Sequence, residues 1–318
     1  MFSIKRVICL LLMFFLSIGV ADAKTVRFAI LSDIHYTTEQ KDIEHSARNW
    51  GRTQKLLDSA IDGINISDID FVVFLGDNID RSDENLLNSF LKKIRRINKP
   101  YYMCLGNHDA YKISGISKED YAKIVNKYGK SRKYNSFNYT FPITQEIMGI
   151  VVDASFPVAP NSHGVITKKT MAWIDKTLEE NSDKKVLIFQ HFPIKEPYDK
   201  KTHNIVNKTA YEEMLAKHSN ILAVFSGHYH REKIIKTKDG VYHVSVSSLG
   251  ETNKYQFVKI TYDARKNKVS DFDMDIFSVD FLEETDPEQE EPQEEDRNTE
   301  NDSDSNEPAS ESSETVEK

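Results

Sequence analysis

Aspartate, asparagine and histidine side chains recur in this sequence directly after short apolar segments. The candidate metal ligands among them are Asp33, His35, Asp77, Asn107, His191, His228 and His230. The set holds carboxylates, imidazoles and one amide oxygen but no thiolate, which favours manganese, iron or zinc over copper(I) or an iron–sulfur cluster. Seven ligands are too many for one tetrahedral zinc ion. The sequence therefore predicts two divalent metal ions that share a bridging carboxylate.

Such a pair of ions points to one kind of chemistry. Two ions about 3.5–4 Å apart can clamp both the attacking and the leaving oxygen of an in-line phosphoryl displacement. They also lower the pKa of a bridging water molecule, so that hydroxide is available as the nucleophile near neutral pH. The ligand types thus predict metal-dependent hydrolysis of a small phosphorylated substrate, at a hydroxide bridging the two ions.

The apolar segments before these ligands are typical of strands buried on both faces. These segments are residues 26–31, 71–75, 100–105, 186–189 and 221–225. Apolar residues at helical spacing lie between them, in residues 47–64, 83–97, 168–180 and 209–217. Alternation of strand and helix predicts an α/β fold with largely parallel strands, whose functional groups collect beyond the carboxyl ends of the strands. A glycine before Asp77, Asn107 and His228 fits a sharp turn that points each ligand inward.

Further β-rich segments follow one another without helices between some of them. They are residues 134–141, 149–153 and 240–248, and residues 254–280 have the pattern of closing strands. Consecutive strands with short connections favour antiparallel pairing. We therefore expect a second, more antiparallel sheet beside the parallel one.

The ligand residues fall in five blocks that resemble the signature motifs of calcineurin-like metallophosphoesterases. The blocks are Asp33-x-His35, Gly76-Asp77-x-x-Asp80, Gly106-Asn107-His108-Asp109, His191 and Gly227-His228-x-His230. They occur in the order and at the distances usual in that family, across about residues 26–250. The resemblance implies a four-layer α/β/β/α sandwich of two mixed β-sheets flanked by helices. It also implies a binuclear phosphatase or phosphodiesterase.

The resemblance assigns the seven ligands to two metal ions. The first ion would be bound by Asp33, His35 and His230, and the second by Asn107, His191 and His228. Asp77 would bridge the two ions. The implied cofactor is therefore a pair of divalent metal ions (manganese, iron or zinc).

Other residues of the same blocks have implied roles that do not involve metal coordination. His108 would stabilise the transition state or protonate the leaving oxygen, and Asp109 would orient the His108 imidazole, as carboxylates behind catalytic histidines do. Asp80 matches an acid that lies behind the metal ligands. For Asp80 and Asp109, capping of a loop is the alternative interpretation.

At several motif positions this sequence differs from other branches of the family, which narrows the branch that it resembles. Purple acid phosphatases place a tyrosine where His35 stands, so an iron–tyrosinate site is not expected. Serine/threonine protein phosphatases carry a glutamate where Asp109 stands. Their Asp-Arg-Gly is only partly similar to residues 80–82, which makes Arg81 a candidate phosphate contact. The Ser-Asp-x-His start is more similar to the bacterial cyclic-nucleotide phosphodiesterase-type branch. His163 and His203 are further candidate substrate contacts from loops.

The two ends of the chain differ in composition from the rest. Residues 1–23 combine Lys5 and Arg6, an apolar run and Ala21-Asp22-Ala23, which predicts a cleavable signal peptide. An uncleaved membrane anchor is the alternative, although the apolar run is short of the roughly 20 residues that span a bilayer. We therefore expect a secreted or periplasmic protein with no transmembrane span after cleavage. Cys104 is then the single cysteine, so no intramolecular disulfide can form.

Residues 283–318 carry 16 acidic and 2 basic residues and no aromatic residue. Such a segment buries too little apolar surface to order itself, so it is predicted to be a disordered acidic tail. The tail is interpreted as a solubilising or spacer segment, and the alternative is that it contacts a basic partner of unknown identity. The predicted metallophosphoesterase domain is residues 24–282. Its residues are mildly basic once the tail is set aside, which suits an anionic substrate. No nucleic-acid recognition motif is found.

Two functions from different classes fit this sequence. The first is a hydrolase of phosphomonoesters or phosphodiesters. The alternative is a non-catalytic metallophosphoesterase-like binding scaffold that has kept the fold. Scaffolds of that kind usually lose metal ligands or the counterpart of His108, whereas this chain keeps all of them. The sequence therefore favours the hydrolase and leaves its substrate open.

Overall fold

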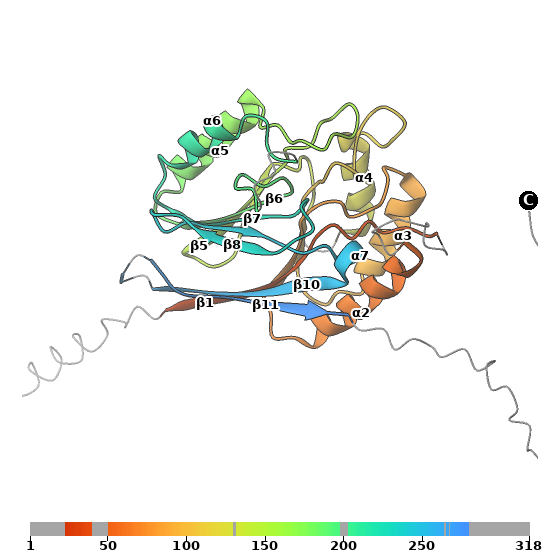
Figure 1. Cartoon of the computed structure of the whole chain (residues 1–318), viewed down its shortest axis with the longest axis horizontal. Coiled ribbons are helices and arrows are strands. Elements are labelled where there is room, and N and C mark those ends of the chain that lie inside the picture. The colour runs from red at the N-terminus through yellow and green to blue at the C-terminus, as the bar shows by residue number, and fades with distance from the viewer. Residues whose placement is uncertain are drawn as a thin grey trace, which may run out of the picture. The chain divides into compact units, whose positions relative to one another are not determined.

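A computed structural model describes residues 23–39, 50–129, 132–197, 203–263, 265–266 and 268–279. These residues form two β-sheets with helices beside them (Figure 1). Residues 1–22 of the predicted signal peptide and the acidic tail of residues 283–318 lie outside the described residues. The predicted domain boundaries therefore stay a prediction.

The first sheet has five strands in the order β11-β10-β1-β2-β3. Its strands are β1 (Lys24–Leu31), β2 (Phe71–Phe74), β3 (Tyr101–Met103), β10 (Lys254–Asp263) and β11 (Lys268–Ser278). The strands β1, β2 and β3 run parallel to one another. The β10–β11 hairpin joins antiparallel at the free side of β1, with Lys24 paired to Tyr262. The predicted closing strands of residues 254–280 are thus part of the first sheet.

The second sheet has six strands in the order β4-β5-β6-β7-β9-β8. Its strands are β4 (Tyr139–Pro142), β5 (Ile147–Val152), β6 (Lys185–Gln190), β7 (Ile221–Ser226), β8 (Lys233–Lys236) and β9 (Tyr242–Ser245). The four central strands β5, β6, β7 and β9 are parallel. The two outer strands β4 and β8 are antiparallel to their neighbours.

Both sheets are therefore mixed, as the resemblance implied. The expectation of one parallel and one more antiparallel sheet is wrong. The ligand-bearing strands are divided between the sheets, with β1, β2 and β3 in one and β6 and β7 in the other. The antiparallel strands were misplaced because their partners lie far away in the sequence, as β10 does from β1, and the pattern of a single strand does not specify its partner.

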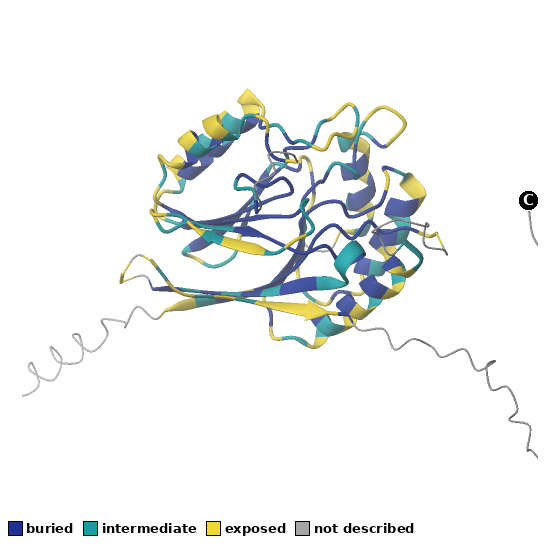
Figure 2. Cartoon of the chain, in the orientation of Figure 1, coloured by how far each residue is buried: buried dark blue, intermediate teal, exposed yellow. Residues whose placement is uncertain are grey.

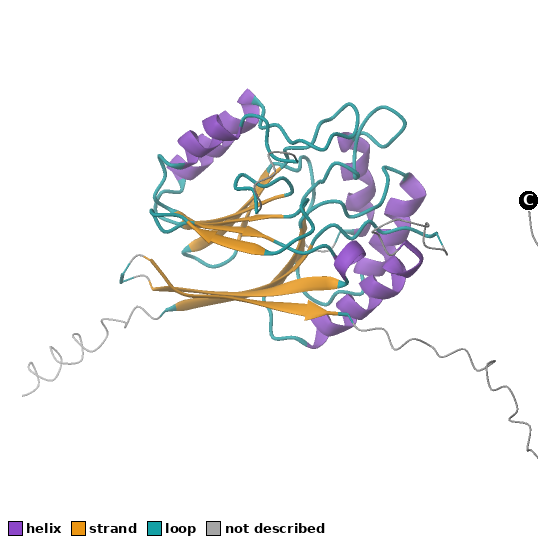
Figure 3. Cartoon of the chain, in the orientation of Figure 1, coloured by secondary structure: helices purple, strands orange, loops and turns teal. Residues whose placement is uncertain are grey.

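The helices lie outside the two sheets (Figure 3). They are η1 (Trp50–Arg52), α2 (Thr53–Ile66), α3 (Glu84–Ile94), α4 (Lys118–Tyr128), α5 (Lys168–Glu180), α6 (Lys208–Leu215) and α7 (Leu249–Thr252). The α5 and α6 helices share a buried cluster with β5, β6 and β7, while Phe90 of α3 packs on Phe74 of β2. The predicted four-layer sandwich is confirmed. None of the described helices has the length and apolar composition that crossing a membrane requires.

Local signals explain where several helices begin. The side chains of Asp83, Ser117 and Thr167 each accept a hydrogen bond from a backbone amide in the first turn of the helix that follows. The helix α4 was not predicted from the sequence. Its apolar stripe is short and most of its other residues are polar, so its helical periodicity is weak.

Aromatic side chains join the two sheets face to face. Phe28 of β1 packs edge-on against Phe189 of β6 and Phe225 of β7, at ring-centroid distances of 5.7 and 5.4 Å. Phe71 of β2 stacks on the same Phe28 ring at 4.9 Å. Figure 2 shows that these central strands are buried. This packing fixes the distance between the sheets and therefore between the loops at their strand ends.

Replacing Phe28 by alanine tests this junction. Phe28→Ala is expected to lower the free energy of unfolding by about 3–5 kcal/mol, because a fully buried phenylalanine leaves a cavity that surrounding rings cannot fill. Chemical denaturation of the purified chain measures the loss. Phe277→Ala is the matched control, since Phe277 is 41% exposed on β11 and should cost much less. Equal losses for both variants would contradict the proposed junction.

Candidate metal centre

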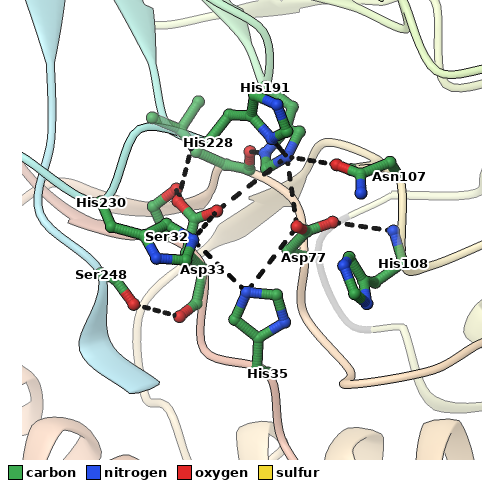
Figure 4. A network of polar contacts seen from close by, with 12 residues as sticks. Ser32, Asp33, His35, Asp77, Asn107, His108, His191, His228, His230 and Ser248 are labelled. Carbon is green, nitrogen blue, oxygen red and sulfur yellow. Dashed lines mark hydrogen bonds and ion pairs between the residues drawn. The ribbon is translucent and has the colours of Figure 1, made fainter. Parts of the chain in front are cut away.

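All seven predicted ligand residues come together where strands of the two sheets end (Figure 4). Asp33 and His35 follow β1, and Asp77 and Asn107 follow β2 and β3. From the other sheet, His191 follows β6, and the pair His228 and His230 follows β7. The centre is therefore built from both halves of the sandwich.

The first cluster has the ligand atoms that the resemblance assigned to the first ion. The Nε2 atom of His230 lies 3.2 Å from Asp33 Oδ1 and 3.5 Å from His35 Nε2. The Oδ2 atom of Asp77 lies 3.8 Å from His35 Nε2. Ligand atoms roughly 2.0–2.2 Å from one ion are separated from one another by such distances. This cluster could hold a divalent cation.

The second cluster forms around His191. Its Nε2 atom lies 3.1 Å from His228 Nδ1, 3.2 Å from Asn107 Oδ1 and 3.4 Å from Asp77 Oδ2. The Oδ2 atom of Asp77 therefore belongs to both clusters. This is the position that a carboxylate bridging two cations would occupy.

His191 and His228 are each held so that one ring nitrogen faces the second cluster and the other faces a backbone carbonyl. On the far side of the ring, His191 Nδ1 contacts the carbonyl of Leu75 at 2.9 Å, and His228 Nε2 contacts the carbonyl of Ser162 at 2.8 Å. A ring nitrogen that donates to a carbonyl carries the proton, so the opposite nitrogen keeps its lone pair. These contacts select the tautomers that a metal site needs.

The backbone at the ligands is strained. Left-handed φ angles, which non-glycine residues seldom adopt, occur at Asp33, His35, Asp77, His228 and His230. Such conformations cost about 1–3 kcal/mol each and cluster at functional sites. The strain lets consecutive ligand residues turn back toward the strand ends.

Two glycines make room for the carboxylates. A Cβ atom on Gly106 would overlap the Oδ1 and backbone nitrogen of Asp77, and one on Gly227 would overlap Ser32 Oγ and crowd Asp33 Oδ2. These positions need glycine because another chain segment approaches closely. Beyond the predicted sharp turn, glycine at positions 106 and 227 therefore allows close packing of the neighbouring segment.

The charges of the centre are strongly coupled. Burial disfavours ionised carboxylates, but the imidazoles of His230 and His191 outweigh it and hold the pKa of Asp33 below its usual range. His191, together with His108 and His35, likewise outweighs burial and lowers the pKa of Asp77. Against the effect of burial, Asp77 and Asp33 raise the pKa of His191 to about 9, and Asp33 raises that of His230 to about 10. Burial, reinforced by His191, lowers the pKa of His228 to about 3. Carboxylates in this setting favour a nearby positive charge.

One buried oxygen completes the fit to a cation. Asp33 Oδ2 accepts hydrogen bonds from Ser32 Oγ and from the backbone nitrogen of His228. Asp33 Oδ1 is buried, meets no geometric hydrogen-bond criterion and faces His230 Nε2 at 3.2 Å. A buried carboxylate oxygen is costly unless a positive charge contacts it, which a protonated His230 or a cation would supply. The donor set and this oxygen together fit divalent metal ions.

His108 lies beside the centre. Its ring centroid is 4.8 Å from that of His35, and its backbone nitrogen donates to Asp77 Oδ1 at 2.9 Å. Its ring Nδ1 contacts the carbonyl oxygen of Asp80 at 2.5 Å. Figure 4 shows the imidazole next to Asp77, on the side away from His230. The ring is therefore held close to the two clusters.

The carboxylate of Asp109 is held by backbone and side-chain donors of two loops. Its oxygens accept hydrogen bonds from Gly106 N, Asn78 N, Asn78 Nδ2 and Ile79 N, at 2.8 to 3.2 Å. The expected role of Asp109 in orienting the His108 imidazole stays a prediction, and the Asp80 carbonyl also contacts that ring. The hydrogen bonds of Asp109 join the loop after β2 to the loop after β3, which favours the loop-capping alternative.

The remaining predicted residues lie at different distances from the clusters. Asp80 Oδ1 is 3.9 Å from His35 Nδ1, which is the place of an acid behind a ligand. Arg81 is half exposed and lies 3.7 Å from Glu39, with no described contact to the ligands. The rings of His163 and His203 stack at 6.3 Å. His203 in turn lies 5.4 Å from the ring of His228.

Sequence reasoning missed Glu251 and Ser248. The Glu251 carboxylate contacts His230 Nδ1, and Ser248 Oγ donates to the carbonyl oxygen of Asp33. Both residues belong to the segment around α7, which follows the last motif by about twenty residues. The serine-rich sequence before α7 signals a helix start, but nothing in it indicates contact with the ligands.

The comparisons with known proteins agree with this geometry. A model of the family described as calcineurin-like phosphoesterase matches residues 26–232. A probable glycerophosphodiester phosphodiesterase GpdQ of Arcobacter nitrofigilis is 28% identical over 169 residues, which are 51% of this chain and 57% of that protein. A probable cyclic nucleotide phosphodiesterase of Moraxella catarrhalis is 24% identical over 164 residues, 51% of this chain and 58% of that protein. The chain spans a little more than half the length of both relatives.

A solved structure has the same fold. The crystal structure of a dimetal phosphatase from Danio rerio matches with a TM-score of 0.59 and 17% identity. The match covers 74% of this chain and 92% of that one. It supports the arrangement of layers described above.

Proposed function

Because the chain belongs to the calcineurin-like phosphoesterase family, we propose that it is a metal-dependent hydrolase of phosphomonoesters or phosphodiesters. The observation that carries the proposal is the position of Asp77 Oδ2, which lies within 4 Å of ligand nitrogens in both clusters. A single carboxylate oxygen between two sets of ligands is the arrangement that two-metal hydrolysis needs.

The proposed ligands are those of the two clusters, with Asp77 as the bridge. When bound, two ions (manganese, iron or zinc) would supply a hydroxide nucleophile and neutralise charge on the phosphate. His108 would protonate the leaving oxygen or stabilise the transition state from beside the bridge. The Asp80 carbonyl would hold its imidazole in place, and Asp109 would keep the loops of Asp77 and Asn107 together.

The substrate class is proposed from the relatives and from the loops. Two relatives carry the names of phosphodiesterases, which supports phosphodiesters as the first class to test. His163 and His203 lie on the side of His228 and would contact the substrate there. Export by the predicted signal of residues 1–23 would place the reaction outside the cytoplasm.

The direct test is a comparison of substrates on one preparation. The chain is stripped of metal with a chelator, then supplied with manganese, iron or zinc and assayed on an aryl phosphate and a bis-aryl phosphate. We expect hydrolysis that depends on the added metal. The scaffold alternative predicts no turnover of either ester and fewer than one transition metal per chain, and that result would refute the hydrolase.

Removal of metal should also lower stability. Each ion present at a hundredfold its dissociation constant stabilises the folded state by about 2.7 kcal/mol, if it does not bind the unfolded chain. For a domain of this size we expect the melting temperature to rise by about 5–10 °C per ion bound at that excess. Calorimetry of the chelated and reloaded protein measures the shift, and calcium serves as the control cation. No shift with any transition metal would count against the site.

A substitution of His108 separates catalysis from metal binding. His108→Ala is expected to lower kcat by about 10²–10⁴-fold while metal content is unchanged, because its backbone amide still donates to Asp77. The loss should be larger for an alkyl ester than for an activated aryl ester if the ring protonates the leaving oxygen. His218→Ala, which removes a partly buried pair with Asp175, is the control. Equal kcat values for His108→Ala and the wild type would exclude the proposed role.

A further inference from the structure

Glu251 lies at the back of one ligand histidine. Its carboxylate oxygen Oε2 contacts His230 Nδ1, the ring nitrogen that points away from the first cluster. The other ring nitrogen, Nε2, lies 3.2 Å from Asp33 Oδ1 inside the cluster. His230 is therefore held between two carboxylates, one inside the cluster and one behind it.

The short helix α7 that carries Glu251 is attached to the end of β1. The backbone nitrogens of Leu249 and Gly250 donate to the carbonyl oxygens of Ser32 and Asp33, each at 3.0 Å. Ser248 Oγ donates to the Asp33 carbonyl at 2.7 Å, as Figure 4 shows, and accepts from Glu251 N at 3.0 Å. The place of the Glu251 backbone is thus fixed relative to Asp33.

The approach of α7 to this segment is close. A Cβ atom on Gly250 would overlap the carbonyl oxygen of Ile34 and lie 3.1 Å from that of Asp33. The helix therefore cannot shift toward or away from β1 without breaking several contacts. Through Glu251 the same helix reaches the loop after β7, which belongs to the other sheet.

We propose that Glu251 is a positioning residue for His230 and that α7 joins the two loops that supply Asp33 and His230 to the first metal ion. This inference rests on the proposed function, since it concerns the same centre. The carboxylate keeps the proton on Nδ1, orients the ring and makes Nε2 a stronger donor to a cation. The far nitrogens of His191 and His228 contact neutral backbone carbonyls instead.

The test measures metal affinity directly. The metal-free full chain is titrated with Mn²⁺ by equilibrium dialysis, for the wild type, Glu251→Ala and Glu251→Gln. We expect Glu251→Ala to weaken Mn²⁺ binding by about 10–100-fold, the usual effect of removing a residue behind a metal-bound histidine. Glu251→Gln should lose less, because its amide oxygen still accepts a hydrogen bond from Nδ1. Excess Mn²⁺ should restore kcat toward the wild-type value in both variants.

Glu232→Gln is the matched control. Glu232 is a carboxylate in the loop after β7 that carries His230, and it accepts hydrogen bonds from Ser247 Oγ and from Lys254 Nζ. This variant should bind Mn²⁺ as the wild type does. Wild-type affinity in Glu251→Ala, or an equal loss in Glu232→Gln, would overturn the proposal. If the metal-free Glu251→Ala chain does not fold, Glu251→Gln decides, and an unchanged dissociation constant refutes the role.

The outcome is independent of turnover. A wild-type chain that binds Mn²⁺ but hydrolyses no phosphate ester would refute the hydrolase and leave the affinity comparison valid. A wild-type chain that hydrolyses esters, with Mn²⁺ affinity unaffected by Glu251→Ala, would refute the positioning role alone.

Discussion

Asp77→Asn is expected to lower kcat by more than about 100-fold. Loss of a residue that only supports a metal ligand costs up to about 100-fold, and loss of the bridging ligand itself should cost more. Asn differs from Asp in charge but hardly in shape, so the backbone of the loop should be retained. The substituted side chain would offer one neutral oxygen where the wild type has an anionic oxygen shared by both clusters. We expect metal content to fall from two ions per chain to one or none.

The measurement combines metal analysis with steady-state kinetics on the same preparation. Asp271→Asn is a matched control, because Asp271 is a half-exposed carboxylate on β11 that pairs with Lys259. An exposed ion pair of this kind contributes about 0–1 kcal/mol, so neither metal content nor kcat should change. Two ions per chain and normal kcat in Asp77→Asn would disprove the bridging assignment.

Gly106→Ala is the second substitution with a large expected effect. The added methyl group would overlap the Oδ1 and the backbone nitrogen of Asp77, and the latter cannot move aside as a flexible side chain can. Overpacking of this kind typically costs about 1–3 kcal/mol. Because the carboxylate that must yield is the proposed bridge, we also expect loss of at least one metal ion and of activity.

The control and the readouts separate the local clash from a general effect of alanine. Gly129→Ala should cost less, since Gly129 has φ −62° and a Cβ there would only crowd the Arg132 carbonyl oxygen, at 3.2 Å. Melting temperature, metal content and kcat are measured for both variants. Normal metal content in Gly106→Ala would show that the loops after β2 and β3 can separate without loss of the centre.

The ligand residues were predictable because each is specified by a local pattern. A buried strand, a tight turn and a ligand side chain follow one another within a few residues, as in Phe71–Phe74 followed by Asp77. A strand buried on both faces is recognised from its own sequence. The site residues therefore did not require knowledge of strand order.

The division into two sheets was not predictable in the same way. Strand β1 pairs with β10, whose partner for Lys24 is Tyr262, far along the chain. Side-chain contacts with no local motif were also missed. Glu251 reaches His230 from a separate helix, and the hydrogen bonds of Asp109 depend on the loop of Asn78. Such contacts follow from tertiary packing and leave little trace in a short window of sequence.

The division of the ligands between two sheets also bears on how the molecule is held together. Asp33 and Asn107 extend from the first sheet, whereas His191 and His230 extend from the second, so each proposed ion would bind both. A cation could enter only after the sheets have packed, and would then act as a cross-link across the sandwich. Within the described part of the chain, the only cysteine is the unpaired Cys104. The metal ions would therefore cross-link the two sheets, as disulfide bonds cross-link chain segments in other proteins.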